Sequence, residues 1–184
     1  MTLPRIIILE ALKRHLRANV PLDPADPSRQ LFKVRHERFR ESTLEEMPCV
    51  AIRYLGDDSP DVTRGTDDPS RMSLAETVME LRVELIVDTP IAAESDRDTA
   101  GDPDDGDDDT GMEFASRIVE ICLGALFTAG QETETMGGVI WDARYDGTGD
   151  NDDVSSPDNV RLAERLTLVY RARAEAPHQL LVGE

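Results

Sequence analysis

Two stretches of the chain carry apolar residues at the spacing of a helix. The first, residues 4–18, begins at Pro4, which suits the first turn of a helix, and ends in basic residues that complement the helix dipole. Its apolar positions are Ile8, Leu9, Leu12 and Leu16. The second, residues 112–126, has an apolar stripe of Phe114, Ile118, Ile121, Cys122 and Ala125. The pattern therefore predicts two amphipathic helices.

Other segments alternate between apolar and polar residues, which is typical of strands. The alternation is clearest at 74–87, where apolar residues point one way and charged residues the other. The apolar set is Met79, Leu81, Val83, Leu85 and Val87. Segments 48–55 and 159–174 are also predicted strands, 139–145 is a short one, and 31–39 is a weaker one.

Polar segments separate these elements. Residues 19–29, 56–73 and 146–158 are rich in proline, glycine or aspartate and are predicted loops. Residues 88–111 are acidic and of low complexity, and we expect a flexible loop because dense like charges repel and few apolar residues can anchor them. Residues 175–184 are expected to form a flexible tail.

The order of the elements predicts the fold class. A helix, two or three strands, a second helix and two strands fit one domain over residues 1–184. Two helices suffice to cover one face of a small sheet. We therefore expect an α+β fold, a two-layer sandwich with a four- to five-stranded, mainly antiparallel sheet and both helices on one face.

A sheet covered on one side leaves its other face for a partner. Ile86 and Ile140 would point to that open face, where apolar residues indicate a protein contact, unless they are the scattered apolar residues of any surface. Trp141, the only tryptophan, would share a side with Val139 and Ala143, as a core or interface anchor. Ile86, Ile140 and Trp141 are the interface candidates.

The charge balance excludes several partners. The chain has 38 acidic and 20 basic residues, for a net charge of −18. Sequence-specific nucleic-acid binding and adhesion to an anionic membrane both need clustered cations, so neither is expected. Only two of the basic residues are lysines, Lys13 and Lys33. This composition resembles proteins of extreme halophiles, in which molar salt screens self-repulsion, and a high-GC genome is the alternative explanation.

The sequence contains no recognisable catalytic motif. The histidines lie far apart in the chain, at His15, His36 and His178, and no phosphate-binding loop or nucleophile elbow occurs. Cys49 and Cys122 lie in apolar runs and are predicted to be small buried hydrophobic residues. We therefore predict a protein that is not an enzyme and uses no cofactor.

The acidic runs raise the alternative of a metal site. Hard cations bind clustered carboxylates, but no window of twelve residues has the order of an EF-hand. Asp102, Asp104 and Glu113 fit parts of that pattern and are weak candidate ligands, while Gly106 and Asp107 break it.

The order and texture of the segments resemble one known family. The helix at 5–17 precedes the strand PCVAIRYL at 48–55, the strand ELRVELIVD at 80–88 and the helix EFASRIVEICLGAL at 113–126. The strand RLAERLTLVYRAR closes the chain at 161–173. This layout resembles the tail terminator, or tail completion, proteins of long-tailed bacteriophages and related archaeal viruses. The acidic insert and the scarcity of lysine depart from the family pattern.

The resemblance implies a structural virion protein. It implies a homohexameric ring that caps the head-proximal end of the tail tube, ends tube growth and contacts the tail tube protein and a neck or head-completion protein. DNA would pass through the ring, and the protein would reside in the host cytoplasm during assembly and in the tail or neck of the virion afterwards. The alternatives are another head–tail connector protein, or a small halophilic protein that binds metal through carboxylates.

Overall fold

The computed structural model describes residues 3–37, 47–58, 76–90, 109–127, 135–149, 159–173 and 176–182, which form two helices and six strands. In chain order they are α1 Pro4–Asn19, β1 Lys33–His36, β2 Cys49–Asp58, β3 Glu76–Pro90, α2 Asp109–Leu126, β4 Asp142–Thr148, β5 Asn159–Arg173 and β6 Ala176–Leu181. The expected order from the first helix to β5 is confirmed, and β6 follows it as an additional strand.

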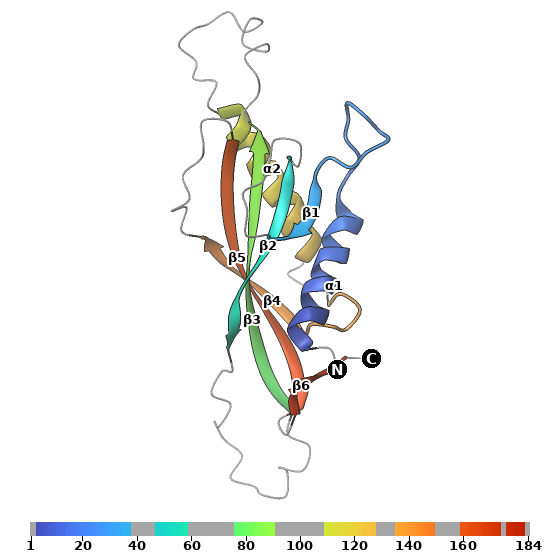
Figure 1. Ribbon diagram of the computed structural model, residues 1–184, viewed down its shortest axis with the longest axis vertical. Coiled ribbons are helices and arrows are strands. Elements are labelled where there is room, and N and C mark those ends of the chain that lie inside the picture. The colour runs from blue at the N-terminus through green and yellow to red at the C-terminus, as the bar shows by residue number, and fades with distance from the viewer. Residues whose placement is uncertain are drawn as a thin grey trace, which may run out of the picture.

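The strands form one mixed sheet. Its order is β1-β2-β3-β5-β4, and β6 also pairs with β5. Only β1 and β2 run parallel; the other pairs are antiparallel. β3 and β5 pair along their whole length, from Glu76 opposite Arg173 to Pro90 opposite Asn159. This long ladder is the axis of the molecule in Figure 1.

Both helices lie on the same side of the sheet (Figure 1). α2 packs on β3 and β5, while α1 packs on β1 and on α2. The fold is thus the expected α+β sandwich of two layers, with one short strand more than the four or five expected.

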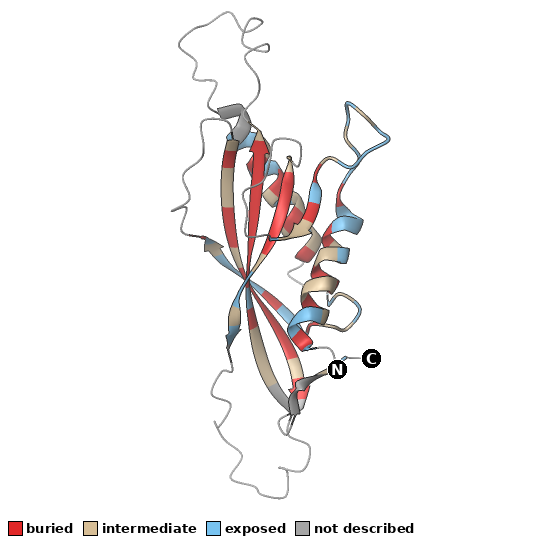
Figure 2. Cartoon of the chain, viewed as in Figure 1, coloured by how far each residue is buried: buried red, intermediate tan, exposed pale blue. Residues whose placement is uncertain are grey.

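The core lies between the sheet and the helices. Figure 2 shows buried residues along the central strands and on one side of each helix. The helices contribute Ile8, Leu12, Leu16, Ile118, Cys122 and Leu126, and the central strands contribute Leu81, Val83, Leu85, Val87, Leu166 and Leu168. The strand residues are those at alternate positions, so the direction in which 74–87 was expected to face is confirmed. Cys49 and Cys122 are buried, as predicted.

Two histidines connect α1 to its neighbours. The Nε2 atom of His15 lies 2.7 Å from the carbonyl oxygen of Ala125 in α2, and Nε2 of His36 in β1 lies 2.8 Å from a carboxylate oxygen of Glu10. The side chain of His15 is half-buried at this contact between the helices. These contacts give both residues a structural role.

The C-terminal segment differs from the expected flexible tail. Residues 176–181 form β6, which pairs with the end of β5. β5 runs past the residues that β4 covers, and β6 occupies the edge that this leaves free. Leu180 packs against the core, which gives the segment an apolar anchor.

The acidic segment was expected to be a loop at 88–111. Its ends belong instead to regular elements, because β3 continues to Pro90 and α2 begins at Asp109. Residues 91–108 lie outside the described part of the chain.

Gly149 is a position where close packing requires glycine. A methyl group there would lie 3.2 Å from the Cβ of Ala163 and would meet the buried carboxylate of Glu84. We expect Gly149→Ala to lower the free energy of unfolding by about 1–3 kcal/mol. Gly124→Ala in α2 is the matched control, because its methyl group meets nothing within 4 Å. It should raise stability by about 0.5–1 kcal/mol through helix propensity. Thermal unfolding of both variants measures these changes. Equal changes in stability would contradict the close packing at Gly149.

Candidate self-association surfaces

The open face of the sheet is charged rather than apolar. Glu84 lies between two arginines, with Arg53 Nη1 3.0 Å from one carboxylate oxygen and Arg165 Nε 3.4 Å from the other. Asp88 pairs with Arg161 through two contacts, of 2.6 and 3.3 Å. The side chains of Glu84 and Asp88 are almost completely buried, at 4% and 2% exposed. The face is therefore covered by its own ion pairs.

Ile86 lies on this open face, as expected, but it is buried. It forms a small cluster with Ala51 and Ala163, separate from the main core, and is 3% exposed. The register places these three residues side by side on β2, β3 and β5, between the rows of ion pairs. The expectation that Ile86 is available to a partner is wrong, because this cluster and the charged residues around it already cover its side chain.

Ile140 is also buried, at 2% exposed, and it belongs to the main core. The expected strand at 139–145 begins at Asp142 instead, so the alternation does not apply to Ile140 and Trp141. Its backbone N–H bonds to the carbonyl of Thr135 in the preceding turn, which directs the chain away from regular pairing. Ile140 is thus a core residue, and the expectation of an exposed side chain is wrong.

Trp141 is the interface candidate that the structure leaves exposed. Its side chain is 53% exposed, whereas Ala143, expected on the same side, is buried. The backbone N–H of Trp141 donates to the carbonyl of Val169 at 2.8 Å, which fixes the residue beside β5. The guanidinium of Arg171 lies 3.9 Å from the ring centroid and covers one face. Trp141 is therefore not a core anchor, and its interface role stays a prediction.

A second exposed apolar group lies where α1 begins and β2 ends, and sequence reasoning missed it. The side chains of Leu3, Ile6, Tyr54 and Leu55 are each between 38% and 48% exposed. The guanidinium of Arg5 lies 5.7 Å from the ring of Tyr54. A register shift after Tyr54 disturbs the alternation there, so residue order alone does not reveal which side chains reach the surface.

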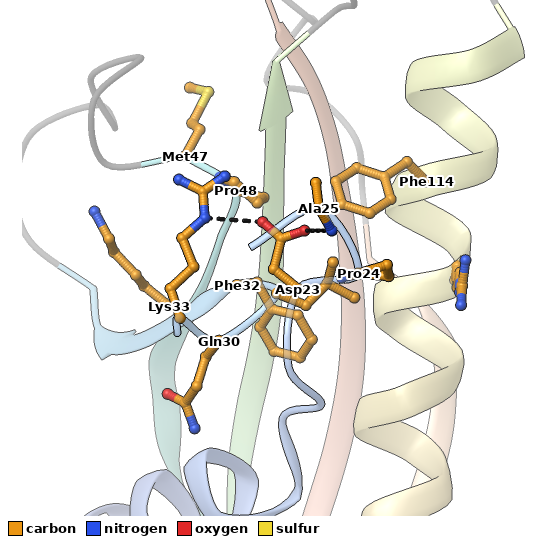
Figure 3. Close-up of a pocket in the computed structure, with 12 residues that line it drawn as sticks. Asp23, Pro24, Ala25, Gln30, Phe32, Lys33, Met47, Pro48 and Phe114 are labelled. Atoms are coloured by element: carbon orange, nitrogen blue, oxygen red, sulfur yellow. Dashed lines mark hydrogen bonds and ion pairs between the residues drawn. The ribbon is translucent and has the colours of Figure 1, made fainter. Parts of the chain in front are cut away.

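A pocket of about 520 Å³ opens between the loop after α1, the start of β2 and the first turns of α2 (Figure 3). It is lined by Asp23, Pro24, Ala25, Arg29, Gln30, Leu31, Phe32, Lys33, Met47, Pro48, Phe114 and Arg117. Asp23 accepts hydrogen bonds from the Ala25 backbone N–H at 2.9 Å and from Arg29 Nε at 2.8 Å. These bonds hold the pKa of Asp23 below its usual value, so the carboxylate stays charged and holds the loop closed on itself.

The candidate metal ligands are not brought together in the described part of the chain. Asp102 and Asp104 lie outside it, and Glu113 is exposed on α2. Across the described ranges, no group of three or more histidine, cysteine, aspartate and glutamate side chains is placed to hold a metal ion. No helix among the described residues is long and apolar enough to cross a membrane.

The environments of the three tyrosines predict that their hydroxyl groups lose their protons at higher pH in the folded protein than in the unfolded chain. Burial raises the pKa of Tyr170 to about 12, and donation of the Tyr145 hydroxyl to Glu164 at 2.6 Å, with burial, raises the pKa of that group. Burial and then a hydrogen bond to Asp57 raise the pKa of Tyr54. The folded state therefore binds these protons more tightly than the unfolded state, whose tyrosines titrate near pH 10.

The stability that these groups contribute is present below pH ~10 and is lost as the pH rises through the folded-state pKa values, toward about 12 for Tyr170. Tyrosinate absorbance should accordingly rise mostly above pH ~10. The rise in tyrosinate absorbance near pH 12 should be missing in the Tyr170→Phe variant. A wild-type curve that is complete by pH ~10 would contradict the packing of Tyr170.

Neither models of known protein families nor curated protein sequences match this chain.

Proposed function

We propose that this chain is a structural virion protein that forms a ring at the head-proximal end of a viral tail tube, where it ends tube growth and joins the tail to the neck. The observation that carries the proposal is the exposure of Trp141, which directly precedes β4, on a sandwich whose large apolar strand residues are mostly buried. Tryptophan, with tyrosine and arginine, is enriched among the few residues that contribute most of the binding energy near the centre of protein interfaces.

The arrangement of the elements supports the same proposal. The order of helix, strands, helix and strands carries the resemblance to tail terminator proteins, and it is the order that the chain adopts. A ring needs two different patches on each copy, because one patch must meet a different patch on the neighbour. Among the described strands, the short β1 and β4 are the outermost ones of the sheet, and edge strands are common contact sites.

The charge supports a wall around a DNA conduit. A net charge of −18 repels phosphate, so DNA passing through the ring would not adhere to it. The partners would be further copies of this chain, the tail tube protein and a neck or head-completion protein. The protein would be located in the host cytoplasm before assembly and in the tail or neck of the virion afterwards.

Electron microscopy of the purified chain mixed with tail tubes of the same virus tests the proposal. Rings that sit at one end of each tube are the expected result, and they should stop tube elongation when tube protein is added. Binding to isolated neck complexes with tube ends left bare would instead favour another connector component. Tight binding of one calcium or magnesium ion by a monomer, measured by calorimetry, would favour the metal-binding alternative.

A further inference from the structure

The pocket of Figure 3 combines an apolar floor with a cationic rim. Phe32 is 1% exposed and closes the bottom, and Phe114 reaches across from α2 beside Pro24 and Ala25 (Figure 3). Pro48 lies on the opposite wall. The cations that line the pocket are Arg29, Lys33 and Arg117.

Such a lining favours an aromatic guest. Phenylalanine and proline side chains offer flat apolar contacts, and cations attract the face of an indole ring more strongly than that of other aromatic rings. The volume of about 520 Å³ lies in the range of ~300–1,000 Å³ that accommodates drug-sized ligands, so an indole side chain fits. Three cations against one lining carboxylate, that of Asp23, give the cavity a positive balance in a chain of net charge −18.

The chain itself carries an exposed indole, at Trp141. Arg171 covers one face of its ring, and the 53% exposure of the side chain shows that the rest faces outward. Asp142 follows Trp141 directly and is also exposed. Its negative charge complements the cations that line the pocket.

Trp141 cannot reach the pocket of its own chain. Along the long axis in Figure 1, the loop after α1 and the first turns of α2 lie toward one end of the helical layer, and the segment at 135–141 lies toward the other. The 16 residues of α1 alone span about 24 Å. The backbone of Trp141 is held to β5 by its hydrogen bond to Val169, so the side chain stays at its own end.

We propose that Trp141 of one copy inserts into the pocket of the next copy, between Phe114 and the cationic rim. This inference rests on the ring proposed above and names its repeating contact. Because the two surfaces differ and lie at opposite ends of the helical layer, each copy can give its tryptophan to one neighbour and receive one from another. Repetition of such a contact closes into a ring when the rotation between copies divides a full turn.

Fluorescence of the wild-type protein reads this contact directly, because Trp141 is the only tryptophan. At about 1 M salt, where long-range repulsion is screened, emission should shift to shorter wavelength as the concentration rises and copies assemble, with light scattering recorded on the same samples. Acrylamide quenching should fall at least about twofold over the same range, because the indole leaves water.

Ala25→Phe tests the pocket, since Ala25 is exposed and lines its mouth. The added ring should raise the concentration needed for assembly at least about tenfold, which corresponds to ~1.4 kcal/mol per contact. Ala18→Phe is the matched control, an exposed alanine of α1 that does not line the pocket, and it should assemble normally. Trp141→Ala should match Ala25→Phe, and the double variant should be no worse than either single variant.

The outcomes separate this contact from the ring. Wild-type rings whose tryptophan emission does not shift, or Ala25→Phe protein that assembles like Ala18→Phe, would overturn the pocket contact and leave the ring proposal standing. Open filaments with shifted emission would support the contact and contradict the ring. A wild-type chain that stays monomeric would contradict both.

Discussion

Leu85→Asp is expected to abolish folding. Leu85 is 2% exposed in the middle of β3, opposite Ile52 of β2 and within the main core. The change removes about 1.5–3 kcal/mol of apolar burial and adds several kcal/mol for an unpaired buried charge. The sum is comparable to the whole stability of a typical domain, about 5–15 kcal/mol. Circular dichroism and thermal unfolding of the purified variant check the result.

Leu22→Asp is the matched control for this change. Leu22 is 60% exposed in the loop after α1, so the same substitution should leave the unfolding temperature nearly unchanged. A soluble Leu85→Asp protein that unfolds cooperatively would mean that β3 faces the other way. It would also remove the basis for placing Glu84 and Asp88 on the open face.

Arg161→Met should lower the free energy of unfolding by about 3–5 kcal/mol, because removing one member of a buried ion pair is strongly destabilising. The side chain of Asp88 is 2% exposed and that of Arg161 is 18% exposed, so water replaces the lost contact poorly. Urea unfolding measures the change. Arg29→Met is the comparison variant: in its pair with Asp23 the arginine is 67% exposed and the aspartate 14% exposed, so water reaches the pair from the arginine side and less stability should be lost than in Arg161→Met.

The double variant Arg161→Met with Asp88→Leu measures what the ion pair itself contributes to stability, apart from the cost of removing only one of its two charges. Replacement of both ions by apolar side chains should recover most of the loss, because neither leaves an unpaired charge. A double variant as unstable as Arg161→Met would show that the pair contributes net stability. A single variant of wild-type stability would contradict the burial of Asp88.

The sequence allowed most of the fold to be predicted because its periodicities are long. Apolar residues at alternate positions locate β3 from Met79 to Val87 and the second half of β5, and a stripe of five apolar residues locates α2. The facing of Leu81, Val83 and Leu85 follows from the same alternation, because a strand places successive side chains on opposite faces.

The surface was harder to predict because it depends on pairs that are distant in sequence. The alternation of β3 correctly places Ile86 on the face with the charged residues. It does not show that Ala51 and Ala163 from two other strands pack beside Ile86 and bury it. Trp141 and Ile140 precede β4, so a pattern read as strand placed both of them wrongly. β6 lacks a clear alternation and forms because β5 offers it an open edge. The pocket likewise combines three segments that only tertiary structure brings together.

Multi-angle light scattering at about 1 M salt, over a hundredfold range of protein concentration, tests most directly whether the chain assembles with itself. We predict one closed assembly whose mass is a small whole-number multiple of the chain mass and stays constant once formed. The mass of a single chain at every concentration would contradict the account.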